Sequence, residues 1–126
     1  MIGLRMVQIS AIYMVIGLLM GLAMGITRDF SFMSVHAHIS LLGWTTMSIT
    51  GLVYTLIPAC SRSRLATIHC WGHNLGLPVM MASLMLEAYG NKSAEKALAA
   101  SSTLVLVSLL LFAVNLFLHG KRDLPQ

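Results

Sequence analysis

Charged residues are scarce in this sequence, and their scarcity limits the class of protein. Of its 126 residues 10% are charged, with eight Lys or Arg and four Asp or Glu, while 57% are hydrophobic. In a soluble domain about a quarter of the residues are charged. The composition therefore excludes an ordinary water-soluble domain and indicates an integral membrane protein.

Cysteine is also nearly absent, with Cys60 and Cys70 the only two and no Cys-x-x-Cys pair. This excludes a disulfide scaffold, a zinc site built on paired cysteines and covalent haem attachment through Cys-x-x-Cys-His. The net charge of +4 does not indicate a nucleic-acid partner, because the basic residues lie between the apolar runs and form no patch.

The chain contains four long apolar segments, at residues 6–26, 32–57, 68–89 and 97–118. A helix needs roughly 20 residues to cross the hydrocarbon layer, and an isolated strand would leave its backbone unpaired in lipid. The first segment is longer than the apolar region of a signal peptide, which is about 7–15 residues. We expect an all-α, integral membrane four-helix bundle that forms one domain over residues 1–126.

The basic residues divide unequally between the two ends of these helices. One end carries Arg5, Arg62, Arg64, Lys121 and Arg122, with Asp123, and the other carries Arg28, Lys92 and Lys96, with Asp29 and Glu95. Cytoplasmic loops are the ones enriched in Lys and Arg. The sequence therefore predicts cytoplasmic termini in a multi-pass protein of the inner (cytoplasmic) membrane, of bacterial type, with the lipid bilayer as its first partner.

Two histidines, His36 and His38, stand where the second segment enters lipid. Ionisable groups at such positions are costly and mark cofactors, cavities or bundle interiors. At about 100° per residue the two rings point to opposite sides of a helix, so one chain cannot offer both to the same metal. Small residues, Ser40 and Gly43, follow on the His36 face, where a flat macrocycle would fit. From the spacing alone, haem ligands and interfacial hydrogen-bonding residues are both open interpretations.

A longer pattern surrounds this pair. His36-x-His38-x-x-x-Leu42-Gly43-Trp44, then Gly51 and Tyr54-x-Leu56-x-Pro58, resembles the haem-bearing helix of haem-copper oxidase catalytic subunits (subunit I). The resemblance is nearest to cytochrome c oxidases that use only b-type haems and to nitric oxide reductases. His69-x-Trp71 and Gly76 look like the start of that family's next helix. The resemblance covers residues 36–78, roughly a third of the chain.

The resemblance implies that His36 and His38 occupy the positions of the high-spin and low-spin haem ligands. It also implies a fold of twelve helices in three arcs, of which this chain resembles one arc. A homotrimer would reproduce the ring, and closed cyclic assembly is the usual form for identical chains. Non-covalent haem b is the expected cofactor, and Arg28, just outside, is placed to pair with its propionates.

The family's copper site takes three histidines from other arcs, whereas the third segment here ends in Glu87, Ala88 and Tyr89. We therefore expect no copper centre of this kind. His36 of one chain and His38 of its neighbour would hold one haem between them, for electron transfer or redox and gas sensing. Whether the chain is an enzyme stays open. The alternatives are an oxygen or nitric oxide reductase and a cofactor-free transporter or assembly protein, although the first segment lacks the carboxylate on which small exporters depend.

His69 and His73 share one helix face at a spacing of four residues, which is also the spacing of metal ligands. A polar helix start near the lipid headgroups is the favoured interpretation. We expect most of the membrane thickness to separate these two from His36 and His38.

Overall fold

The structure, a computed structural model, describes residues 1–121, and all the regular secondary structure within them is helical. Its elements are α1 (Ile2–Thr27), α2 (Met33–His38), the π-helical η1 (Ile39–Thr46), α3 (Met47–Leu56), α4 (Pro58–Ser61), α5 (Arg64–Ala88), the 3-10 turn η2 (Lys92–Ala94) and α6 (Glu95–His119). The predicted all-α class is confirmed. Arg122 and Asp123, used in the orientation argument, lie outside the described residues.

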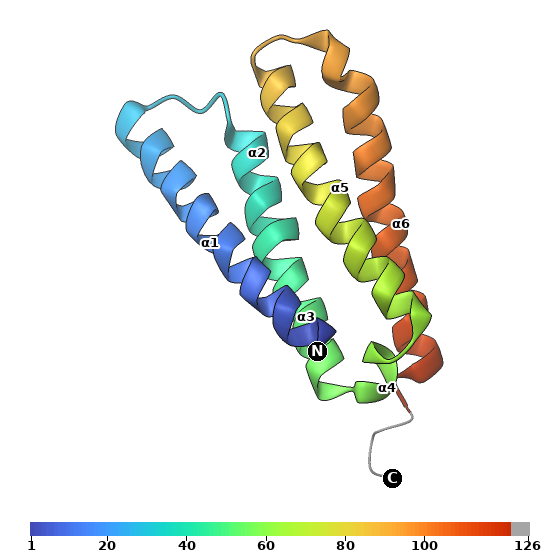
Figure 1. The fold of residues 1–126 in the computed structure, drawn as a ribbon. Coiled ribbons are helices and arrows are strands. Elements are labelled where there is room, and N and C mark those ends of the chain that lie inside the picture. Colours follow the sequence, from blue (N-terminus) through green and yellow to red (C-terminus); the bar gives the residue numbers. More distant parts are fainter. Residues whose placement is uncertain (122–126) are drawn as a thin grey trace.

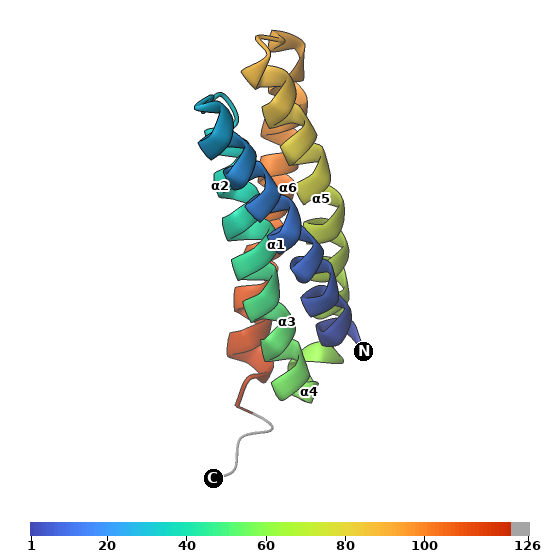
Figure 2. The ribbon, with the colours of Figure 1, turned by 90° about the vertical axis from the view of Figure 1, so that its left-hand side faces the viewer.

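The helices pack as two hairpins (Figures 1 and 2). In the first, α1 runs against the continuous rod formed by α2, η1 and α3, and in the second α5 runs against α6. The short helix α4 joins them at the end where the chain begins. Contacts between the hairpins are sparser than those within each one.

Side-chain caps explain where the second hairpin begins. Ser63 has extended backbone dihedrals, and its Oγ accepts a hydrogen bond from the Ala66 amide at 3.1 Å. A serine in this position satisfies one of the unpaired amides at a helix start. For this reason α5 begins at Arg64, four residues before the predicted start at 68. Ile57 has non-helical dihedrals, and Pro58 at the first position of α4 starts a new helical turn there.

The two loops at the opposite end use the same local device. Asp29 Oδ1 accepts hydrogen bonds from the amide and hydroxyl of Ser31, and Asn91 Oδ1 accepts the same pair from Ser93. The Ser31 hydrogen bonds lower the pKa of the Asp29 carboxyl. Arg28 ends α1 in the left-handed region, with φ of 57°. Short polar side chains thus shape both turns locally, and the rings of Phe32 and Tyr89 join the two turns by an edge contact, with centroids 5.2 Å apart.

The burial pattern suits a lipid bilayer. Large apolar side chains are exposed along all the long helices, whereas His69, His73, Asn115 and Ser10 are fully buried. Among residues 1–121, three helical stretches are long and apolar enough to cross a membrane, namely Ile2–Thr27, Met33–Leu56 and Lys92–His119. The chain is therefore a membrane protein by length and composition. The helix α5 does not reach the same apolarity, and a fourth span remains a prediction.

Gly51 allows α3 to approach α1, and this contact can be tested. A methyl group at Gly51 would lie 2.9 Å from both the Gly3 carbonyl oxygen and Val7 Cγ2, whereas one at Gly25 would meet nothing within 4 Å. We expect Gly51→Ala to lower the free energy of unfolding by about 1–3 kcal/mol through overpacking. Gly25→Ala is the matched control and should be neutral or stabilising, since alanine favours helix. The measurement is unfolding in mixed micelles followed by circular dichroism, and equal effects of the two variants would refute the close approach.

Candidate functional site

His36 lies against the small face of α1. Its Nδ1 is 3.0 Å from the carbonyl oxygen of Gly17, and because a carbonyl only accepts, this nitrogen carries the proton. A methyl group at Gly21 would lie 3.0 Å from Cε1 of the ring, so glycine leaves room for the imidazole there. Nε2 makes no hydrogen bond to the described residues. The ring is thus held in the tautomer whose Nε2 offers a lone pair.

His38 is held in the same tautomer by its own helix. Its Nδ1–H donates to the carbonyl oxygen of Ser34, one turn earlier, at 2.7 Å. Nε2 again has no hydrogen bond within residues 1–121. Histidines that bind metals donate their other ring N–H to a carbonyl or carboxylate in the same way, which fixes the ring and raises its basicity.

A shallow concavity of about 220 Å³ opens beside His36, between α1 and the first part of the rod formed by α2, η1 and α3. It is lined by Met14, Gly17, Leu18, His36, Ser40 and Trp44. Ser40 therefore lies with His36, as its position in the sequence predicted. Gly43 does not line the concavity, because it is buried against Tyr13, whose ring would lie 2.7 Å from an added methyl group. Gly43 serves helix packing in this chain.

Arg28 follows the last residue of α1, in the loop that leads into the helix α2 with His36 and His38. It is exposed, and it forms no ion pair with the described residues. Its guanidinium is thus available to an anionic group approaching this end of the helices.

Directly after His38 the helix widens into the π-helical segment η1, which no pattern in the sequence predicted. Thr45 Oγ1 donates to the Ser40 carbonyl, five residues back, at 3.1 Å. Within this segment the usual ladder between residues four apart is interrupted, and the Leu42 carbonyl accepts a hydrogen bond from His73 Nε2–H at 3.1 Å. Single π-helical segments of this kind are frequent at functional sites.

His69 and His73 are fully buried and form a second cluster. His69 Nδ1 is 2.9 Å from the Tyr54 hydroxyl, and its ring centre is 5.7 Å from that of His73 and 5.3 Å from that of Phe112. The remaining ring nitrogens, His69 Nε2 and His73 Nδ1, are buried with no hydrogen-bond partner among residues 1–121. Both side chains are thus buried between helices, and the favoured interpretation as a polar helix start near the headgroups stays a prediction.

The prediction that most of the membrane thickness separates the two histidine pairs is wrong for His73. Its partner Leu42 follows His38 by four residues, which corresponds to a rise of about 6 Å along a helix. The error has a physical cause, since Ser63 starts α5 early and both histidines therefore lie more than a turn inside the helix. If Ser63 had been recognised in the sequence as the N-cap of this helix, His69 and His73 would have been predicted to lie inside it.

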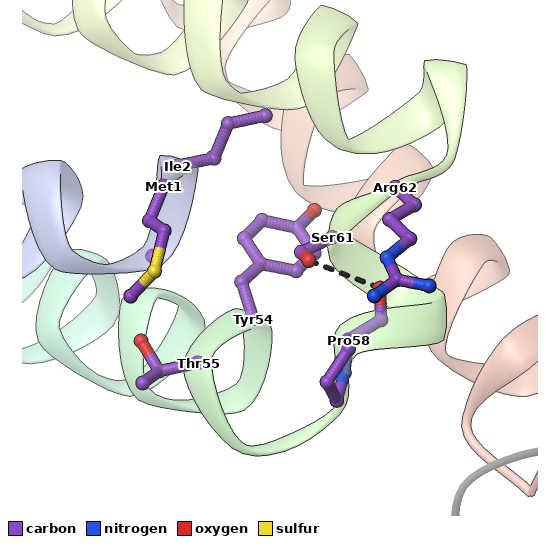
Figure 3. Close-up of a pocket in the computed structure, with 8 residues that line it drawn as sticks. Met1, Ile2, Tyr54, Thr55, Pro58, Ser61 and Arg62 are labelled. Carbon is purple, nitrogen blue, oxygen red and sulfur yellow. Dashed lines mark hydrogen bonds between the residues drawn. The ribbon is translucent and has the colours of Figure 1, made fainter.

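A larger cavity of about 460 Å³ lies at the α4 end of the molecule (Figure 3). It is lined by Met1, Ile2, Gly3, Tyr54, Thr55, Pro58, Ser61 and Arg62. Ser61 Oγ donates to the Pro58 carbonyl at 3.0 Å within its wall. Tyr54 belongs to both places, because its side chain lines this cavity while its hydroxyl contacts His69.

Comparison of the chain with models of known protein families, with curated proteins and with solved structures finds no match.

The Tyr54–His69 hydrogen bond can be tested by Tyr54→Phe. Removing the hydroxyl leaves a third buried ring nitrogen without a partner, which should lower the free energy of unfolding by about 1–3 kcal/mol. Tyr13→Phe is the control, because the half-buried Tyr13 contributes its ring to packing against Gly43. Unfolding in mixed micelles measures both variants. Equal stability of Tyr54→Phe and the wild type would show that the hydrogen bond contributes nothing.

Proposed function

We propose that this chain is a membrane haem b protein whose His36 and His38 ligate haem iron, for electron transfer or redox and gas sensing. The observation that carries the proposal is that both rings adopt the same tautomer. Each donates its Nδ1–H to a backbone carbonyl, and its Nε2 keeps a free lone pair that can bind a metal. Neutral imidazole of this kind is the common axial ligand of haem iron. The resemblance of residues 36–58 to the haem-bearing helix of haem-copper oxidases supports the same assignment.

The surroundings of His36 fit a flat ligand in part. The surface beside the ring is formed by small residues that leave space for a flat ligand, namely Gly17, Gly21 and Ser40. Its apolar part consists of Leu18 and Trp44. However, pockets for ligands of this size measure about 300–1,000 Å³, so the 220 Å³ concavity of one chain covers only part of a macrocycle. A second copy would supply the opposite wall, with its own His38 as the second ligand.

A closed ring of identical chains would repeat this boundary at every interface, and we propose a homotrimer. Each boundary would then hold one haem between His36 of one chain and His38 of the next. Haem bound there would supply one-electron redox chemistry, and the two imidazoles would hold it. Arg28, exposed at the same end, would balance the propionate charges. The oxygen or nitric oxide reductase alternative requires an open position on the iron.

We further propose that α5 is the fourth membrane span and that both termini are cytoplasmic, in a bacterial-type inner membrane. The outward side of α5 carries exposed apolar residues at helical spacing, namely Ile68, Trp71, Leu75 and Val79. Its polar histidines are fully buried. The low average apolarity of α5 thus comes from side chains that would not meet lipid, and its exposed face suits a bilayer.

The first test is an oxidised-minus-reduced absorption spectrum of protein purified in detergent after expression with ample haem. The wild type should show the bands of a b-type haem at one haem per chain, and His36→Ala and His38→Ala should each lose most of them. His119→Ala is the control, because His119 lies at the far end of α6. A colourless wild type, or colour that survives loss of both ligands, would refute the proposal. Carbon monoxide binding by the reduced protein would favour the reductase alternative.

The second test asks whether neighbouring chains share the haem. Co-expression of the His36→Ala and His38→Ala chains should restore about a quarter of the wild-type haem, because in a randomly mixed ring one boundary in four regains both ligands. Each variant expressed alone contains no intact boundary. Haem content per chain, measured after extraction, reports the rescue. If co-expression restores none while the wild type binds haem, the ligands do not come from two chains.

A further inference from the structure

The pair His69 and His73 is not used by the proposed haem site, and its chemistry is unusual for a helix interior. Both side chains are fully buried, and each leaves one ring nitrogen without a partner among the described residues. A buried polar atom without a hydrogen bond costs about 1–3 kcal/mol. Two such atoms on adjacent helical turns therefore point to a group, such as a metal ion or a buried water, that satisfies them.

The hydrogen bonds of the other two ring nitrogens prepare the pair to bind a metal ion. His73 gives its Nε2–H to the Leu42 carbonyl, so its buried Nδ1 has a lone pair. His69 Nδ1 contacts the Tyr54 hydroxyl, and donation of Nδ1–H to that oxygen frees Nε2 of His69 in the same way. Both rings then have the outer hydrogen bond that orients metal-ligating histidines.

The spacing of the rings agrees with a shared ion. A metal–nitrogen bond of about 2.0–2.1 Å places an ion about 3.2 Å from the centre of each ring, so two rings on one ion have centres at most about 6.4 Å apart. The centres of His69 and His73 are 5.7 Å apart.

The charge of the surroundings selects the ion. The acidic residues of the described part of the chain, Asp29, Glu87 and Glu95, are all exposed, so none neutralises a charge placed in this buried cluster. A divalent ion would bring two uncompensated charges into the interior, which is very costly, whereas a univalent ion brings one. We propose that His69 Nε2 and His73 Nδ1 bind one univalent transition-metal ion, copper(I), independently of haem. Imidazole is a suitable ligand for copper.

The cavity in Figure 3 would supply the way in. Tyr54 lines it on one side and reaches His69 with its hydroxyl. Movement of this one side chain would connect the 460 Å³ cavity at the α4 end with the buried pair.

The test is a titration of the full chain in detergent with copper(I), kept reduced under anaerobic conditions, in competition with a chromogenic copper(I) chelator. We expect one tightly bound ion per chain in the wild type and loss of that ion in His69→Gln and His73→Gln. Glutamine keeps a polar side chain for the Tyr54 and Leu42 contacts, and circular dichroism checks that each variant is folded. The His36→Ala/His38→Ala double variant should keep its copper, which separates this site from the haem site.

Two further measurements make the result decisive. X-ray absorption at the copper edge should show nitrogen ligands without sulfur. Sulfur ligands would instead indicate binding by some of the ten methionines and would overturn the proposal. Zinc(II) should bind at least about tenfold more weakly than copper(I), since it adds a second buried charge. Equal zinc affinity, or no copper bound by the folded wild type, would also overturn the proposal.

Discussion

The structure depends on hydrogen bonds between imidazole rings and backbone carbonyls. His36, His38 and His73 each donate one ring N–H to a main-chain oxygen, on Gly17, Ser34 and Leu42 respectively. Where lipid excludes water, a ring N–H must donate to a group of the protein itself. The position of the carbonyl therefore decides which ring nitrogen is protonated. The opposite nitrogen of each ring is thereby left as a lone pair, and both proposed sites use that lone pair.

His38 uses a carbonyl of its own helix, whereas the carbonyls that serve His36 and His73 belong to other helical segments that make them accessible. On α1, Gly21 leaves room for the His36 ring, and the Gly17 carbonyl accepts its N–H. In η1, the π-helical turn makes the Leu42 oxygen available to a neighbouring helix. The small residues and the irregular helix therefore provide the acceptors that hold the imidazoles in place.

The sequence predicted much of this arrangement, because apolar run length and loop charge are local properties. The four helical stretches and the neighbourhood of His36 and Ser40 follow from residues close together in the chain. The π-helical segment has no sequence signature, so the Leu42 acceptor could not be anticipated. Burial of His69 and His73 depends on the cap at Ser63 and on packing against Phe112 of α6, a residue far away in the sequence. The role of Gly43 was likewise decided by a distant partner, Tyr13.

The sparse contact between the two hairpins has a consequence for how the chain reaches its final form. Each hairpin closes through a short polar turn, at Asp29–Ser31 or at Asn91–Ser93, and its helices contact each other more extensively than they contact the other hairpin. Insertion into lipid can then proceed one hairpin at a time, with docking as a later step. The hydrogen bond from His73 to Leu42 joins the two hairpins and can form only when they dock. The proposed copper site would therefore be completed after the helices have entered the bilayer.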